Sequence, residues 1–189
     1  YTTREAAYNT SLGSLMPDDP NRLGYTFNGW STNSGTMENQ FTSSTAVTGA
    51  ATYYAIWSPH SYTVTFNLDG TILTGSGFYN TSLGSLTGTT LGVAEAKARE
   101  NKPGHAFLGW TTNSSLATTD PSITMDTNIT ENITYYAVYQ HDIYTITFDY
   151  GEKLKNLTGT GIYGTSLGAL SGTSIEAASA AAIVEGYRL

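Results

Sequence analysis

Tyr8–Leu15 reads YNTSLGSL, and the same eight residues return unchanged at Tyr79–Leu86. A near copy, YGTSLGAL, stands at Tyr163–Leu170. An identity of this length within a chain of 189 residues indicates an internal repeat. Because a fixed period decides architecture before any single element does, the sequence predicts an array of similar units. Residues that recur with the period are expected to hold each unit together.

Other motifs keep a similar spacing. Tyr62–Phe66 (YTVTF) returns 82 positions later at Tyr144–Phe148 (YTITF), and Gly29–Trp30 returns 80 positions later at Gly109–Trp110. A period of about 80 residues exceeds the roughly 20–50 of solenoid repeats and is long enough for a small domain. Three units are predicted: residues 1–59, a partial repeat that lacks its first strand; residues 60–140, a complete repeat; and residues 141–189, a partial repeat that lacks its last strands.

Composition excludes several classes of protein. The net charge is −7 at pH 7 and Lys and Arg are scattered, which argues against a nucleic-acid-binding protein because those carry a basic stripe. There is no cysteine, so neither a disulfide framework nor a thiolate site is available. No stretch approaches the roughly 18 apolar residues of a membrane span. Charged residues are 12% of the chain, about half the usual share, and Thr and Ser keep the surface polar, which suits an extracellular, cell-surface or cell-wall protein.

The complete unit predicts a hairpin, a helix and two further strands. Alternation of apolar and polar residues along Tyr62–Leu68 is typical of a half-buried strand. A glycine-rich turn over 69–77 follows. The remaining predicted elements are a second strand over 78–83, a helix over 90–101, and strands over 106–111 and 133–139.

The partial units predict variations on this order. In the third unit, Thr173 and Glu176 form a capping box that opens a helix, and Gly186 ends it. In the first unit, Met16–Leu23 carries two prolines and two aspartates, so its helix is expected to be shortened or missing. The fold class is α+β, with tandem repeats arranged as beads on a string.

These motifs resemble the Listeria–Bacteroides repeat, also called the internalin B-repeat. The resemblance is carried by Gly24–Trp30 (GYTFNGW), Gly104–Trp110 (GHAFLGW), and the closing strands Thr52–Trp57 and Thr134–Tyr139, besides the YTVTF-type opening strands. It implies a β-grasp-like fold for each repeat and tandem arrays in secreted or cell-surface proteins, often adhesins. It implies no catalytic residues.

Candidate chemistry is sparse. His60 and His141 align with each other at the predicted junctions between units, just before the opening strand, so they are expected to recur with the repeat. His105 takes the place held by Tyr25, which indicates an aromatic packing slot. Catalysis by a histidine needs a nucleophile or an orienting carboxylate, and the sequence points to neither. The acidic residues lack the spacing of a calcium-binding loop. We therefore predict no catalytic residue, no cofactor and no metal site.

Aromatic residues are the remaining candidates for a binding surface. Trp30 and Trp110 recur in register, which favours the core of each repeat over a sugar-binding surface. The possible ligand contacts are the tyrosine pairs on the closing strands, because one member of each adjacent pair must face outward. These residues are Tyr53, Tyr54, Tyr135 and Tyr136.

The sequence leaves three functional hypotheses open. The first is a non-catalytic structural or adhesive segment that acts as a stalk or spacer in a long surface protein. The second is a repeat module that binds a host protein or a glycan. The third is a filament subunit that assembles head to tail with itself through strand completion between chains.

Overall fold

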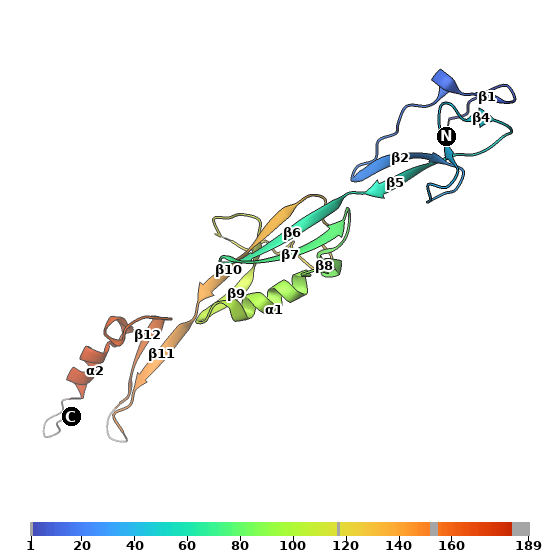
Figure 1. The fold of residues 1–189 in the computed structure, drawn as a ribbon. Coiled ribbons are helices and arrows are strands. Elements are labelled where there is room, and N and C mark those ends of the chain that lie inside the picture. The colour runs from blue at the N-terminus through green and yellow to red at the C-terminus, as the bar shows by residue number, and fades with distance from the viewer. Residues whose placement is uncertain (1, 117, 152–154, 183–189) are drawn as a thin grey trace. The chain divides into compact units, whose positions relative to one another are not determined.

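The computed structural model describes residues 2–116, 118–151 and 155–182. The fold is mixed α+β and mostly sheet, with two α-helices among the described residues (Figure 1). Two compact units divide the chain. One comprises Tyr1–Val64, Thr74–Thr90 and Met125–Ile133, and the other comprises Thr65–Leu73, Leu91–Thr124 and Thr134–Leu189.

Residues 2–59 form small antiparallel sheets. A three-stranded sheet has the order β3-β2-β5, and a two-residue strand β1 pairs with β4. In the larger sheet Trp30 on β2 lies opposite Ala55 on β5. No helix forms in the described residues 16–23 apart from a short 3-10 turn before them, as the prolines predict. The elements are β1 (Thr10–Ser11), η1 (Gly13–Leu15), β2 (Tyr25–Ser31), β3 (Gln40–Phe41), β4 (Ala46–Val47) and β5 (Tyr54–Pro59).

A five-stranded sheet follows, with the order β8-β7-β6-β10-β9. Val64, Phe66 and Leu68 on β6 are fully buried and alternate with more exposed residues, which confirms the predicted strand. The predicted helix is confirmed as α1, which packs beside β9 (Figure 1). The elements are β6 (Ser61–Leu68), β7 (Thr71–Phe78), η2 (Leu83–Ser85), β8 (Thr87–Gly88), α1 (Leu91–Asn101), β9 (His105–Thr111) and β10 (Ile133–His141).

The predicted hairpin is wrong in its second strand. Only Asp69 and Gly70 form the turn, and both have positive φ (56° and 98°). Positive φ at both positions gives a two-residue turn whose twist matches that of the two strands it connects. Strand β7 therefore covers 71–78, where the sequence predicted a turn. Gly75 and Gly77 lie inside this strand. A Cβ on Gly75 would stand 2.2 Å from the Thr89 carbonyl oxygen. The absence of a Cβ at both positions permits this close packing against the strand.

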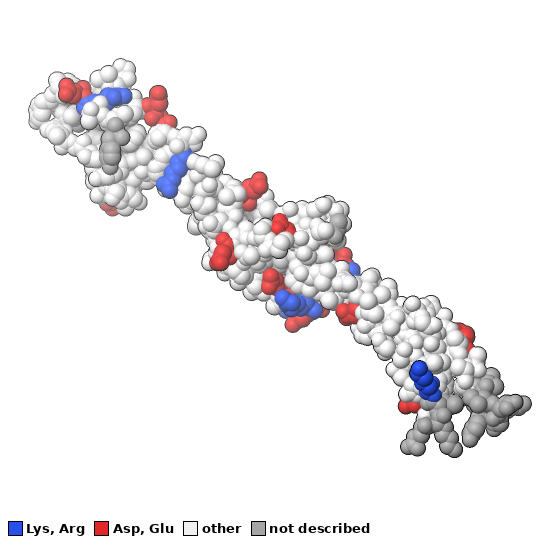
Figure 2. Space-filling model, turned by 180° about the vertical axis from the view of Figure 1, so that it is seen from behind, with Lys and Arg blue, Asp and Glu red and all other residues white. Residues whose placement is uncertain are grey.

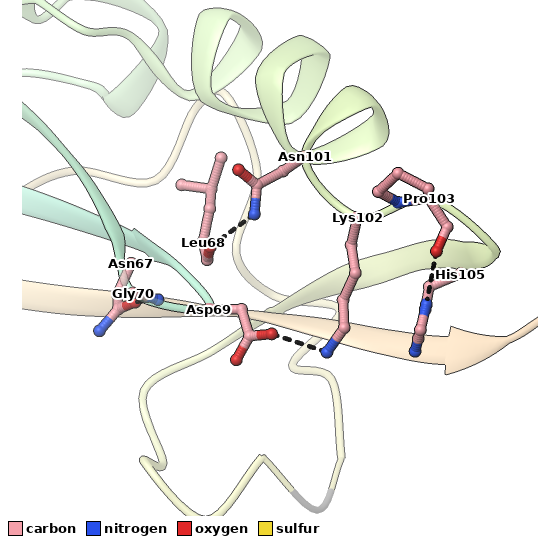
Figure 3. Close-up of polar contacts among 8 residues, drawn as sticks. All are labelled: Asn67, Leu68, Asp69, Gly70, Asn101, Lys102, Pro103 and His105. Atoms are coloured by element: carbon pink, nitrogen blue, oxygen red, sulfur yellow. Dashed lines mark hydrogen bonds and ion pairs between the residues drawn. The ribbon is translucent and has the colours of Figure 1, made fainter. Parts of the chain in front are cut away.

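Polar contacts tie the end of α1 to this turn (Figure 3). The Asn101 side-chain amide donates to the Leu68 carbonyl at 2.6 Å, and the Lys102 ammonium lies 2.6 Å from an Asp69 carboxylate oxygen. The Gly70 amide donates to the Asn67 side-chain oxygen at 2.8 Å. The hairpin turn and the helix end thus hold each other in place.

The last described elements form a three-stranded sheet with the order β11-β12-β13, followed by a helix. The helix is capped by Ser174, whose hydroxyl oxygen accepts from the Ala177 amide, so the predicted start at Thr173 is one residue early. The predicted end at Gly186 lies outside the described residues. The elements are β11 (Ile143–Phe148), β12 (Leu157–Ile162), η3 (Leu167–Ala169), β13 (Ser171–Gly172) and α2 (Ile175–Ala181).

Candidate functional site

Ionisable side chains are dispersed over the structure. Figure 2 shows acidic and basic residues interspersed, without a continuous patch of either sign on this face. Among the described residues, no group of three or more His, Asp or Glu side chains is placed to hold a metal ion. No helix in that part of the chain is long and apolar enough to cross a membrane.

The three histidines lie in two places. The His60 ring is within 3.1 Å of the Thr26 hydroxyl and 3.4 Å of the Tyr62 hydroxyl. His105 and His141 face each other across β9 and β10, with ring centroids 4.2 Å apart. The sequence did not predict this pair, because its members lie on strands separated by a long loop.

Trp30 and Trp110 are packing residues. Trp110 is 2% exposed and lies 5.3 Å from both Phe66 and Phe107 between ring centroids, which confirms its predicted place in the core. Trp30 is half-buried and lies 5.5 Å from Phe27. Neither buried indole Nε1 makes a hydrogen bond within the described residues. Both side chains therefore contribute apolar packing, and their indole N–H groups contribute no hydrogen bond within the described residues.

The predicted ligand-contact tyrosines differ in exposure. Tyr54 is 44% exposed, whereas Tyr53 is half-buried and stacks on Phe41 at 4.0 Å. Tyr135 is only 3% exposed, and burial raises the pKa of its hydroxyl, with the Asp120 charge adding to the effect. Tyr136 is half-buried. The accessible members of the two pairs are thus Tyr54 and Tyr136.

The feature that recurs with the repeats is a backbone clamp where one strand runs into the next. Between β5 and β6, the His60 amide donates to the Gly24 carbonyl at 2.8 Å. The His60 carbonyl accepts from the Tyr79 amide, also at 2.8 Å. The Tyr79 ring meets Tyr25 edge to face at 5.8 Å. We call Gly24, His60 and Tyr79 the Gly24 joint.

The same clamp stands between β10 and β11. The Asp142 amide donates to the Gly104 carbonyl at 2.9 Å, and the Asp142 carbonyl accepts from the Tyr163 amide at 3.1 Å. The Tyr163 ring lies 6.2 Å from His105, so His105 takes the role of Tyr25, as its aromatic slot predicts. We call Gly104, Asp142 and Tyr163 the Gly104 joint. His60 therefore corresponds to Asp142, and the expected equivalence with His141 is wrong by one residue.

Both joints require glycine for two independent reasons. Gly24 and Gly104 have φ of +77° and +69°, a region in which a side chain is strained. A Cβ at these positions would lie 2.2 Å from the Tyr79 ring and 2.0 Å from the Tyr163 ring. The tyrosine that opens the repeated element, Tyr79 or Tyr163, thus packs its ring directly against the glycine backbone.

Tyr144 adds a polar contact to the Gly104 joint. Its hydroxyl donates to an Asp142 carboxylate oxygen at 3.2 Å. Desolvation, this hydrogen bond and the neighbouring Asp142 charge raise the pKa of Tyr144 above its ordinary value. The rise moves ionisation of this phenol still further from neutral pH.

Comparison with known proteins identifies the class. A family model, the Listeria-Bacteroides repeat domain, matches residues 2–56 and 62–138, and the chain belongs to this family. Two relatives from Evansella cellulosilytica carry the names "Putative membrane protein" and "Putative Gly-rich membrane protein"; they are 30% identical over 145 residues and 27% identical over 144 residues. The matches cover 77% and 76% of this chain but only 20% and 15% of the relatives. No solved structure matches this chain significantly.

Proposed function

We propose that this chain is a non-catalytic repeat segment of a long extracellular surface protein, in which it acts as a structural spacer. The observation that carries the proposal is the recurrence of one joint, with the same backbone atoms, at Gly24 and at Gly104. Membership of the repeat family supports it, as do the low share of charged residues and the relatives named as membrane proteins.

The proposed units are residues 1–59, 60–140 and 141–189, each a β-grasp-like repeat or part of one. The two segments that match the family model fall inside the first two units. The middle unit has the order hairpin, helix and two further strands along the chain. With these boundaries, each joint stands where one unit meets the next.

In a spacer, such a joint connects two neighbouring repeats without a freely rotating linker. A linker residue with an unpaired amide and carbonyl rotates easily, because water satisfies its polar groups in many conformations. In each joint a single linker residue, His60 or Asp142, has both backbone groups paired. Its amide donates to the glycine carbonyl, and its carbonyl accepts from the tyrosine amide. Rotation of the linker therefore breaks two hydrogen bonds and separates the tyrosine ring from the glycine.

Adhesion is a second candidate, favoured by the exposure of Tyr54 on a closing strand. An exposed aromatic ring beside few charges suits contact with a host protein or the apolar face of a sugar. Tyr136 is the corresponding residue of the middle repeat. Loss of cell or glycan-array binding in a Tyr54→Ser, Tyr136→Ser double variant would favour adhesion, and unchanged binding would rule these residues out.

Spin-label distance measurements test the spacer proposal. The chain has no cysteine, so labels are placed at will by substitution of Lys97 and Leu167, both exposed. We expect one narrow distance distribution for the parent chain and a broad one for Gly104→Ala, while Gly70→Ala, away from the joint, stays narrow. A parent distribution as broad as that of Gly104→Ala would contradict the proposal.

A further inference from the structure

Two histidines stand directly opposite each other where β9 begins and β10 ends. The strand register pairs His105 with His141. The Asp142 amide donates to the Gly104 carbonyl, which is the bond that flanks a non-hydrogen-bonded pair in an antiparallel sheet. Side chains of such a pair lie closer together than those of a hydrogen-bonded pair, and here the ring centroids are 4.2 Å apart. The backbone therefore holds the two imidazoles next to each other.

A hydrogen bond fixes which nitrogen of His105 carries a lone pair. Its Nδ1 lies 3.0 Å from the Pro103 carbonyl oxygen (Figure 3). A carbonyl oxygen can only accept, so Nδ1 carries the proton and Nε2 of the neutral ring carries the lone pair. A backbone carbonyl that accepts from one ring nitrogen is the common partner of a histidine whose other nitrogen binds a metal ion. His105 is thus oriented as a ligand through Nε2.

The spacing and exposure of the pair suit a transition metal ion. Neutral imidazole is a preferred ligand of Zn²⁺, Ni²⁺ and Cu²⁺. Metal–nitrogen distances of about 2.0–2.1 Å place two ligating nitrogens roughly 3.0–3.4 Å apart. Rings with centroids 4.2 Å apart reach this separation by rotation of the side chains alone. His141 is exposed and His105 is half-buried, so an ion reaches the pair from solvent with water as its remaining ligands.

The joint itself does not need two histidines. The corresponding pair at the Gly24 joint is Tyr25 and Pro59, which lie opposite each other in the register of β2 and β5. That joint has the same two backbone hydrogen bonds as the Gly104 joint. A tyrosine and a proline are therefore compatible with the joint, and its formation does not account for the imidazoles of His105 and His141.

We propose that His105 and His141 together bind a divalent transition metal ion of the class of Zn²⁺, Ni²⁺ and Cu²⁺. Among the described residues, no third His, Asp or Glu is placed to join the pair, so the ion exchanges with solution. His105 follows Gly104 and His141 precedes Asp142, so the bound ion ties together the two strand ends of the Gly104 joint. Within this class Cu²⁺ binds most tightly, as it does at most nitrogen sites.

Titration calorimetry of the chain, purified without a histidine tag, with NiCl₂ and with ZnCl₂ tests the site. We expect the parent chain to bind one equivalent of either ion saturably. His105→Tyr is the matched variant, because Tyr25 makes the equivalent contact with Tyr79 at the Gly24 joint, so the ligand is lost and the aromatic packing is kept. In His105→Tyr and in His141→Gln we expect affinity to fall more than about 10-fold, since loss of a group that merely orients a ligand already costs about 10–100-fold.

Two controls separate this site from other metal binding. His60→Gln removes a histidine whose ring nitrogens lie 3.1 and 3.4 Å from the hydroxyls of Thr26 and Tyr62, and it should bind the ions like the parent. CaCl₂ should produce no binding, because Ca²⁺ prefers oxygen ligands. The inference would be overturned by absent binding of Ni²⁺ and Zn²⁺, by equal binding in His105→Tyr, or by an equal loss in His60→Gln.

Hydrogen exchange tests whether the ion joins the two strands. The Asp142 amide, which donates to the Gly104 carbonyl, lies next to the proposed site. We expect this amide to exchange more slowly in saturating ZnCl₂ than in a chelator in the parent chain, and equally fast in both solutions in His141→Gln. Unchanged exchange in the zinc-saturated parent would overturn the inference, because an ion held by one histidine alone does not tie β9 to β10.

Discussion

Replacement of Gly104 by alanine probes the joint with a single methyl group. The added Cβ would stand 2.0 Å from the Tyr163 ring, far inside van der Waals contact, in a backbone with φ of +69°. The ring and the glycine then cannot keep their present positions together. Gly70 provides the matched control, because it also has positive φ (+98°) but has open space where a Cβ would point.

The two glycines separate backbone strain from steric overlap. A side chain in the left-handed region costs about 1–2 kcal/mol, and this applies to both positions. Forcing a methyl group into a packed contact adds about 1–3 kcal/mol, and this applies to Gly104 alone. We therefore expect Gly104→Ala to destabilise the fold by about 2–5 kcal/mol and Gly70→Ala by about 1–2 kcal/mol.

Urea unfolding followed by tryptophan fluorescence measures both variants. A Tyr163→Ala background removes the ring, so Gly104→Ala should there cost only as much as Gly70→Ala. Equal losses for Gly104→Ala and Gly70→Ala in the parent chain would refute the reasoning, because strain alone would then account for the glycine.

Three further predictions follow from the described contacts. Trp110→Ala should destabilise the chain by about 3–5 kcal/mol in the same urea assay, because the indole is buried against two phenylalanines; a loss below about 1 kcal/mol would mean that the ring is not part of the core. Ser174→Ala should cost about 1 kcal/mol and reduce helical circular dichroism, whereas Thr173→Ala should do neither, and the reverse order would move the cap to Thr173. In ultraviolet titration the pKa of Tyr144 should lie above the ordinary tyrosine range. Asp142→Asn should move this pKa back toward that range, because the Asp142 carboxylate accepts a hydrogen bond from the phenol and repels the phenolate. An unchanged pKa in Asp142→Asn would contradict that interaction.

Local patterns in the sequence predicted the elements whose cause is local. Alternation along 62–68 predicts β6 because burial on one face selects every second residue. The predicted helix over 90–101 matches α1 because leucine and alanine recur on one face and Pro103 stops the helix. The family resemblance was confirmed for the same reason, since its motifs are short and contiguous.

The sequence did not predict contacts between residues far apart along the chain. Gly75 and Gly77 indicated a turn, because glycine is the common turn residue, but here a distant carbonyl and side chains press against a strand. The joints pair a glycine with a tyrosine more than 50 positions away. The available signal was that both residues recur with the same period, and spacing alone does not say which recurring residues touch.

Hydrogen exchange of two amides measures the joints directly. The His60 and Asp142 amides belong to linker residues, yet each donates to a glycine carbonyl, at 2.8 and 2.9 Å. We predict that both exchange as slowly as amides in the middle of β6, and that Gly24→Ala and Gly104→Ala each accelerate only the amide of their own joint. Exchange of both parent amides at the rate of an unstructured linker would contradict the presence of a joint between repeats.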